Sequence, residues 1–513
     1  MFNILFRKKY SLADESTGQT TLEKKLGFLD LTALGIAAIV GAGIFSTIGI
    51  CVSKGGTGVV FLFIFTAISC LFSALCYAQF ASHIPTSGSA YTYAYHSFGE
   101  IVAWIIGWDL FMEYAVSNIA VAISWSDYLS AFVQQYGILL QKYLVINGQH
   151  IRLDWPAFII NIFITTLCYI GIKESKNMNN IWVVMKLLLI GAVIAVSVFY
   201  IDTALWLPLF PAGLSGVLFG VSSVFFAYIG FDAITTTAEE CINPQKDIPR
   251  AIIASLIIST LIYIALTLVV SGMVHYSKLE VGDPLSFIFV SHGMHKFAAF
   301  ISLISLVTLS GVMLVYQLGQ PRIWMAMSRD GLLPSLFSKI HTRFKTPYIS
   351  TVITGVAVGV PALFANIQDI IDLTSIGTLF SFAIVCAGIS YMELTGSVPN
   401  SRFKIPYISS AKIAPAIILC IAFTIWQNDY WGIIFTEKIF FLIVILVVFV
   451  VAIVKKLSLI PILGLICNLY LMSELSTTSQ LRFVIWLIIG LAVYFMYSIR
   501  HSKLNARKGA SDT

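Results

Sequence analysis

The sequence predicts an all-α membrane protein with fourteen spanning helices, two of which are interrupted near their midpoints. Only 11% of its 513 residues are charged. The mean hydropathy is +0.89, which excludes an ordinary soluble globular protein. Apolar runs of about 20 residues, the length that crosses the hydrocarbon core of a bilayer, recur from Phe28 almost to the C-terminus. Two of these runs contain glycine at corresponding places, about five spans apart.

Fourteen apolar segments have the length of a membrane span. In order, they cover 28–51, 59–82, 100–133, 155–172, 180–201, 215–239, 250–274, 297–326, 347–364, 369–391, 411–428, 437–454, 458–473 and 482–499. The third and eighth are long, which predicts that they tilt or extend beyond the bilayer. Residues 1–27 are polar and lack the features of a signal peptide, so we interpret them as a cytoplasmic tail.

The lysines and arginines are distributed unequally between the two sides of the predicted membrane. With the N-terminus in the cytoplasm, 23 of them fall on the tails, the cytoplasmic loops and the cytoplasmic ends of spans, seven fall on the other side, and Lys186 alone is assigned to the interior of a span. Cytoplasmic loops carry an excess of positive charge, so this ratio supports an even number of spans and a cytoplasmic C-terminal tail at 500–513. The net charge of +6 forms no single basic patch and does not indicate nucleic-acid binding.

The first span is interrupted at Gly41 and Gly43, within the sequence I-A-A-I-V-G-A-G-I-F. In hydrocarbon, an interrupted helix is tolerated only beside a cavity or buried in protein. The half-helix that begins here presents the N–H groups of Ala42, Gly43 and Ile44, which attract a carboxylate. The half-helix that ends near Ile39 presents carbonyls, which suit an ammonium group. Close helix packing through small residues is the alternative explanation.

The sixth span is interrupted at Gly230, within the sequence Y-I-G-F-D. Here the carbonyls of Phe226, Ala227 and Ile229 end one half-helix, and N–H groups near Phe231 open the next. Such paired interruptions are the best sequence indication of a transporter binding site. Donors on one wall and acceptors on the other fit a zwitterion, which favours an amino acid over a sugar or a simple ion. One of the aromatic side chains near this break, such as Phe231, is a candidate to cover the substrate.

Two of the ionisable residues within the predicted spans, Lys186 and Glu113, are candidates for proton coupling. Lys186 lies a few residues inside the cytoplasmic end of the fifth span. A buried lysine can take up and release a proton, bridging helices when charged and releasing them when neutral. The alternative is that its ammonium extends to the cytoplasmic interface. Glu113, deep in the third span, suits a second proton carrier, a partner for a cationic side chain, or a structural hydrogen bond.

The sequence carries no motif for enzyme chemistry. It contains no zinc-protease pattern, no phosphate-binding loop and no nucleophile elbow in a convincing context. The eight cysteines have neither metal-ligand nor disulfide spacing. We therefore expect a carrier driven by a gradient, with no enzyme activity, metal or cofactor.

Four stretches resemble a known family over roughly residues 20–505. They are G-I-A-A-I-V-G-A-G-I-F, P-T-S-G-S-A-Y-T-Y-A-Y, F-F-A-Y-I-G-F-D-A-I-T-T-T-A-E-E and G-Q-P-R-I-W-M-A-M-S-R-D-G-L-L-P, which begin at Gly35, Pro85, Phe225 and Gly319. The chain resembles the amino acid–polyamine–organocation superfamily, specifically its cationic amino acid transporter branch and bacterial relatives. The last two helices resemble the fourteen-span members.

The resemblance implies a five-plus-five inverted-repeat transporter fold with discontinuous helices 1 and 6. The repeats would cover 28–201 and 215–391, and four additional helices would cover 411–499. Lys186 matches a lysine of the proton-coupled members, whose eighth span usually offers two hydroxyls. This chain has Ser310 but departs from the pattern at Gly311.

Glu113 likewise matches an acidic position that is common in the branch. The branch also includes carriers of neutral amino acids, and the nameable pocket residues are apolar or small. We therefore favour neutral or broad specificity.

These observations lead to the hypothesis of a proton-coupled amino acid permease that works by alternating access in a bacterial inner or plasma membrane. Its partners would be an amino acid, a proton and the lipid bilayer, with no nucleic acid. An amino acid or polyamine exchanger without net proton flow, and a sensor that binds without transport, remain alternatives. A channel fits less well because the charged residues form no ring.

Overall fold

A computed structural model describes residue 7 and residues 24–504, except 85–88, 147–148, 172–175, 345, 397–402, 414 and 416–438. Most of both predicted tails, nearly all of the predicted span 411–428, and the first four residues of the motif at Pro85 lie outside the described residues.

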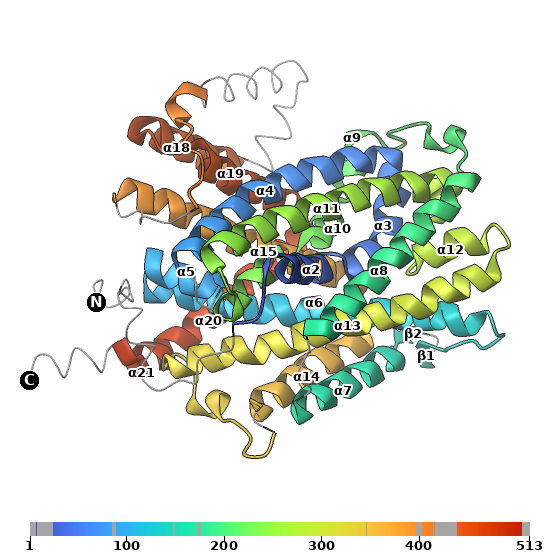
Figure 1. Cartoon of the computed structure of the whole chain (residues 1–513), viewed down its shortest axis with the longest axis horizontal. Coiled ribbons are helices and arrows are strands. Elements are labelled where there is room, and N and C mark those ends of the chain that lie inside the picture. Colours follow the sequence, from blue (N-terminus) through green and yellow to red (C-terminus); the bar gives the residue numbers. More distant parts are fainter. Residues whose placement is uncertain are drawn as a thin grey trace, which may run out of the picture.

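The described chain is built almost entirely of helices (Figure 1). Its N-terminal part contains α2 (Phe28–Ile39), α3 (Ala42–Gly55), α4 (Val59–His83), α5 (Ser89–Ser97), α6 (Glu100–Gln134), α7 (Trp155–Ile170) and α8 (Lys176–Ser197). The middle part contains α9 (Gly213–Leu218), α10 (Val221–Tyr228), the 3-10 helix η5 (Phe231–Glu240), α11 (Pro244–Met273), α12 (Pro284–Val290), α13 (His295–Arg329), α14 (Tyr348–Phe364) and α15 (Ile367–Leu394).

The C-terminal part adds α18 (Ile439–Lys455), α19 (Leu459–Glu474), α20 (Thr477–Val493), the π-helical turn η8 (Tyr494–Ser498) and α21 (Ile499–His501). Short 3-10 turns are η2 (Gly56–Gly58), η3 (Val198–Tyr200), η4 (Thr203–Trp206), η6 (Tyr276–Lys278) and η7 (Ser335–Ser338). One antiparallel hairpin joins β1 (Tyr143–Ile146) and β2 (Gln149–Arg152).

The predicted class, an all-α membrane protein with discontinuous helices 1 and 6, is confirmed. Every predicted span except 411–428 coincides with one helix or, at the interruptions, with separate pieces. Eight helical segments of the described chain are long and apolar enough to cross a membrane, and five further apolar helices have 10–17 residues. The total of fourteen spans stays a prediction. The sequence did not predict the hairpin or the short helices α5 and α12.

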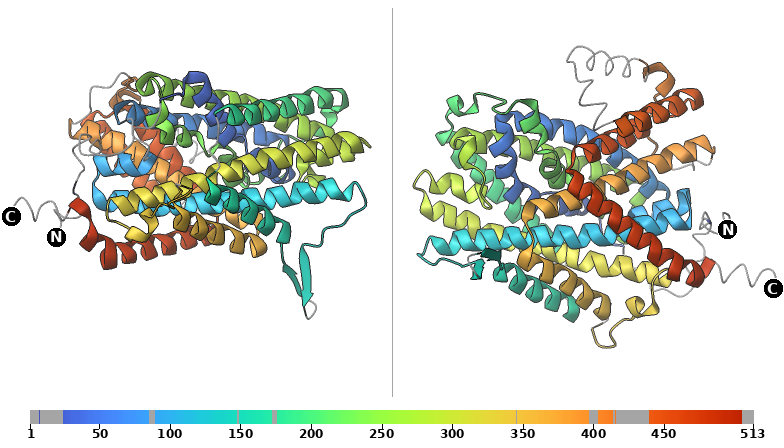
Figure 2. Two further views of the ribbon diagram at one scale, coloured as in Figure 1. Left: turned by 60° about the horizontal axis from the view of Figure 1, so that its bottom comes forward. Right: turned by 180° about the vertical axis from the view of Figure 1, so that it is seen from behind.

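The longest helices form the frame around the interrupted ones. Helix α6 packs along α13, and α7 and α14 pair beside them, while α11 packs against both α2 and α4. The hairpin projects away from the helical body (Figure 2). Helices α5 and α21 lie at the opposite end of the molecule from the hairpin (Figure 1).

Helices at the periphery carry their apolar side chains outward. Leu446 on α18 is 55% exposed and Ile488 on α20 is 59% exposed. In a membrane protein, such a surface faces lipid, because only apolar side chains and satisfied backbone are stable against hydrocarbon. The ionisable groups discussed below, Glu113 on α6, Lys186 on α8 and Asp232 on η5, are instead buried.

Candidate functional site

The first interruption separates α2 from α3 by two residues. Helix α2 ends at Ile39 and α3 begins at Ala42, with Gly41 as its N-cap. The Gly41 N–H turns away from the helical ladder and donates to the Ile39 carbonyl at 2.9 Å. Ala42 and Gly43 are the first two residues of α3, where helical N–H groups have no partner within the helix. The next N–H, that of Ile44, already donates to the Gly41 carbonyl at 3.2 Å.

The second interruption separates α10 from η5 at Ile229 and Gly230. Gly230 has a φ of +119°, a conformation that a residue without a Cβ adopts at little cost. The following ten residues form a 3-10 helix, although such helices rarely exceed three or four residues. Three consecutive threonines stabilise it: Thr235, Thr236 and Thr237 each donate to the carbonyl three residues earlier, at 2.6, 2.7 and 2.9 Å.

The two interruptions cross each other in close reciprocal contact. A Cβ added at Gly43 would lie 2.4 Å from the Ala227 Cα, and one added at Gly230 would lie 2.9 Å from the carbonyl carbon of Ala38. Each break therefore contributes a glycine that fits against the backbone of the other helix. Glycine at these positions is required because the approach of the two main chains leaves no room for a side chain.

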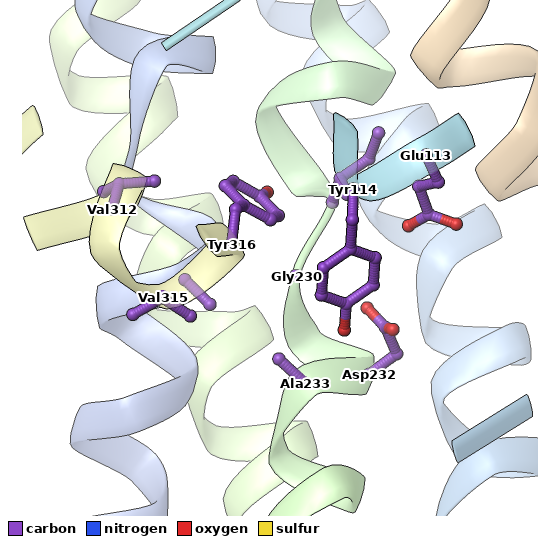
Figure 3. Close-up of a pocket in the computed structure, with 10 residues that line it drawn as sticks. Glu113, Tyr114, Gly230, Asp232, Ala233, Val312, Val315 and Tyr316 are labelled. Carbon is purple, nitrogen blue, oxygen red and sulfur yellow. The ribbon is translucent and has the colours of Figure 1, made fainter. Parts of the chain in front are cut away.

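Two adjoining cavities lie at this crossing. Both are lined by Ala38, Ile229, Val312 and Tyr316. The first cavity also contacts Ile39, Gly41, Ala42, Gly43, Val121 and Phe226. The second also contacts Glu113, Tyr114, Gly230, Asp232, Ala233 and Val315. Figure 3 shows the carboxylates of Glu113 and Asp232 on the same side of the second cavity, beside the ring of Tyr114.

The structure brings most of the predicted site residues to these cavities, but not all. Ile44, Ala227, Phe231 and Lys186 do not line them. The ring of Phe231 packs instead on Phe382, with ring centroids 4.8 Å apart. Phe226 is the aromatic residue of this break that lines the first cavity.

Sequence reasoning missed the wall formed by α13, which consists of Val312, Val315 and Tyr316. Their spacing of three and four residues is a helical pattern that would have predicted one face. However, nothing in the sequence indicated which face of this apolar helix turns inward.

Lys186 lies behind the first interruption. It is 3% exposed, and its ammonium donates to the Ala37 carbonyl at 3.0 Å. In a continuous helix the Gly41 N–H would bond to this carbonyl, but here it bonds to Ile39. A cation at the C-terminal end of α2 also interacts favourably with the helix dipole. Within the described residues, Lys186 forms no ion pair.

The hydroxyl and glycine predicted to flank Lys186 have other neighbours. Ser310 accepts a hydrogen bond from the Trp125 indole N–H at 3.0 Å and donates to the Leu306 carbonyl at 2.8 Å. At Gly311, an added Cβ would lie 2.7 Å from the Trp182 ring. Trp182 lies on the same helix as Lys186, one turn earlier. An indole ring therefore occupies the space beside Gly311.

Three buried carboxyl groups lie on the other side of the cavities. Glu113 and Asp232 are 3% and 4% exposed, and Asp109, one turn before Glu113, is fully buried. Asp109 accepts a hydrogen bond from Ser381 at 2.8 Å, while Glu113 Oε2 has no hydrogen-bond partner among the described residues. An unpartnered carboxyl oxygen beside a cavity can receive a proton or a cationic group from a ligand.

Two interrupted membrane helices that meet at a buried cavity define the class of secondary transporters with discontinuous helices. The sequence model of the amino acid permease family matches residues 26–502. The chain therefore belongs to the amino acid permease family, within the superfamily that its motifs resemble, and it is an integral multi-pass membrane protein. It is an amino acid transporter and not an enzyme.

Known relatives cover nearly the whole chain. The chain is 36% identical to the branched-chain amino acid permease BcaP of Bacillus subtilis, over 98% of this chain and 99% of that protein. It is 35% identical to the methylthioribose transporter of the same organism, over the same shares. It is also 31% identical to the chloroplastic cationic amino acid transporter 9 of Arabidopsis thaliana, over 96% of this chain and 90% of that protein.

Proposed function

We propose that this chain is a proton-coupled amino acid symporter of the cell membrane that works by alternating access, with both termini in the cytoplasm. One observation carries the proposal: the Lys186 ammonium holds the Ala37 carbonyl, at the end of the half-helix α2 that reaches the cavity. The protonation of Lys186 and the occupancy of the cavity thus act on one structural element. The two repeats, 28–201 and 215–391, would move relative to each other around it.

The main-chain groups of the substrate would bind at the first cavity. The N–H groups of Ala42 and Gly43, at the positive end of α3, would hold its carboxylate. The carbonyls of Ile39, Phe226 and Ile229, three residues that line the first cavity, would supply acceptors for its ammonium group.

The side chain of the substrate would be neutral and apolar. Val121, Val312 and Phe226 line the first cavity, and Val315 extends the apolar wall into the second. Phe226 is placed to cover a small aliphatic side chain. The name of the relative in Bacillus subtilis, a branched-chain amino acid permease, supports this choice.

Coupling would follow from the charge of Lys186. When charged, the ammonium interacts with the negative end of the α2 dipole, which is worth up to about 2 kcal/mol in partly buried geometries. When neutral, it holds α2 against α8 less firmly. If the substrate binds one of these two arrangements better than the other, substrate binding changes the proton affinity of Lys186, and protonation of Lys186 changes the substrate affinity. This reciprocal change is what coupling requires.

Cationic amino acid or polyamine exchange is the second candidate. The pair of buried carboxyl groups, Glu113 and Asp232, favours it, because they line the second cavity and would accept a cationic side chain. Under the first proposal, the same groups are protonated or hydrogen-bonded when a neutral substrate is present.

Uptake into proteoliposomes tests these proposals. Under an imposed gradient that is acidic outside, the native protein should concentrate radiolabelled leucine, and excess lysine or arginine should compete poorly. Lys186→Met should abolish accumulation but retain leucine counterflow, whereas Lys339→Met, at an exposed lysine, should behave as the native protein. Accumulation by Lys186→Met would refute the role of the lysine. Stronger competition by arginine would favour the second candidate, and absence of counterflow in the native protein would indicate a sensor.

A further inference from the structure

The β-hairpin between α6 and α7 has one apolar face that the helices leave uncovered. Its strands pair Tyr143 with Arg152 and Leu144 with Ile151. Because successive side chains of a strand point to opposite faces, these two pairs lie on opposite faces of the hairpin. Leu144 is 46% exposed and Ile151 is 41% exposed. One face therefore presents branched aliphatic side chains, although the hairpin lies outside the predicted spans.

Ion pairs fix the base of the hairpin to the two helices that it joins. The Lys142 ammonium contacts the carboxylate of Asp127, near the end of α6, at 2.8 Å. The Arg152 guanidinium contacts Asp154, the N-cap of α7, at 2.9 Å. The Leu153 N–H donates to the Lys142 carbonyl at 2.7 Å. These contacts set the direction of the hairpin. Because both cations are already paired with carboxylates of the chain, they provide no excess positive charge for an anionic partner.

The hairpin extends sideways from the helical bundle. Figure 2 shows that it runs across the direction of the long helices and past the helices beside it. Helix α7 begins directly after the hairpin, at the exposed Trp155, and carries the exposed side chains of Ile159 and Phe163. Tryptophan is enriched where a membrane meets water, and exposed apolar side chains on a spanning helix face lipid. The hairpin therefore continues a surface that is in contact with the bilayer.

The unpaired edges of the hairpin restrict how deep it can lie in the bilayer. Its two strands form the only sheet in the described part of the chain, so each has one edge without a strand partner. Such an edge is not tolerated in hydrocarbon, but water can satisfy it among the headgroups. An isolated two-stranded hairpin is at best marginally stable in water and needs an apolar surface on which to pack. The boundary between headgroups and acyl chains meets both conditions.

We propose that this hairpin is a membrane anchor that lies among the lipid headgroups beside α7, with Leu144 and Ile151 toward the acyl chains and Tyr143 toward water. Its partner is the lipid surface itself, as for other interfacial amphipathic segments. Because the cations at its base are paired within the protein, zwitterionic lipid is sufficient and anionic headgroups are not required. The inference depends on the membrane-spanning fold and is independent of the substrate and of proton coupling.

Nitroxide accessibility in phosphatidylcholine nanodiscs tests the anchor in the full chain. Spin labels are attached to Leu144→Cys, Ile151→Cys and Tyr143→Cys, and collisions with oxygen, which concentrates in hydrocarbon, are compared with collisions with a water-soluble nickel chelate. Phe163→Cys, on the lipid-facing surface of α7, and the exposed Lys339→Cys give the lipid and water references. The native chain, treated in the same way, gives the background from its own cysteines, and thermal unfolding verifies that each variant folds.

The ratio of oxygen to nickel collisions at positions 144 and 151 should lie several-fold above the ratio at position 143, which should resemble the water reference. Ratios at all three positions that equal the water reference would overturn the inference, as would a reversed pattern. Labels at 144 and 151 that neither reagent reaches, with dipolar broadening between labels, would replace lipid by a second copy of the chain. A ratio that rises only after phosphatidylglycerol is added would refute an anchor that needs no anionic lipid.

Discussion

Replacing Gly43 by alanine should separate the two interruptions. The added Cβ would lie 2.4 Å from the Ala227 Cα, 2.9 Å from its nitrogen and 3.0 Å from its Cβ. Two of these three atoms are main chain and cannot rotate away. Because ordinary carbon contacts are about 3.5–4.0 Å, the two segments must move apart by about 1 Å. Overpacking of this kind costs about 1–3 kcal/mol in a well-packed core.

The same substitution can be made at glycines whose surroundings differ. At Gly41, the nearest atom would be Val312 Cγ1 at 3.4 Å, an ordinary contact with a side chain. At Gly191, inside α8, nothing lies within 4 Å of the added Cβ. Alanine there should be neutral or stabilise the helix by up to about 1 kcal/mol, because alanine is the better helix former. The three glycine-to-alanine variants therefore make the same chemical change against progressively more open surroundings, from Gly43 to Gly41 to Gly191.

Thermal unfolding and leucine transport in proteoliposomes measure the outcome. Gly191→Ala should match the native protein in both, Gly41→Ala should lose little stability, and Gly43→Ala should lose both stability and most transport. If Gly43→Ala unfolds and transports like Gly191→Ala, the breaks do not cross as closely as described, and the reasoning about the cavity fails with it.

Three further predictions concern regions around the site. Gly311→Ser should destabilise the protein, because the added Cβ would collide with the Trp182 ring. Adding Trp182→Ala should restore part of the lost stability, so the effects of the two substitutions on thermal unfolding should be non-additive. Burial raises the pKa of the Asp283 carboxyl, in the loop before α12, to about 7. The folded state therefore keeps this proton up to a higher pH than the unfolded state does, and the free energy of unfolding should fall as the pH rises from about 4 to about 7. Asp283→Asn should flatten this part of the thermal-unfolding profile, and an unchanged profile would contradict the assignment. Ser502→Ala should lower the free energy of unfolding by about 1–3 kcal/mol, because the Ser502 hydroxyl donates at 2.5 Å to the buried Glu100 carboxylate. An unfolding temperature equal to that of the native protein would contradict this prediction.

The sequence by itself determined the class of the protein and the places where its helices break. Hydrocarbon leaves the backbone no partner but itself, so an interruption is tolerated only where it is buried in protein or lines a cavity. This reasoning located the breaks beside Gly41 and Gly230 to within a residue or two. The same cost of polar groups in lipid identified Lys186 and Glu113 as exceptional positions.

Only the tertiary structure decided which groups meet at those breaks. Val121 and Val312 lie on helices that are apolar on most faces, so no periodic pattern revealed which side turns inward. The hydrogen-bond acceptor of Lys186 was not predictable either, because the Ala37 carbonyl is available to the ammonium only when the Gly41 N–H donates to the Ile39 carbonyl instead. Such contacts depend on how far each helix rotates about its own axis against its neighbours, and that rotation is set by packing of the whole bundle rather than by any one segment.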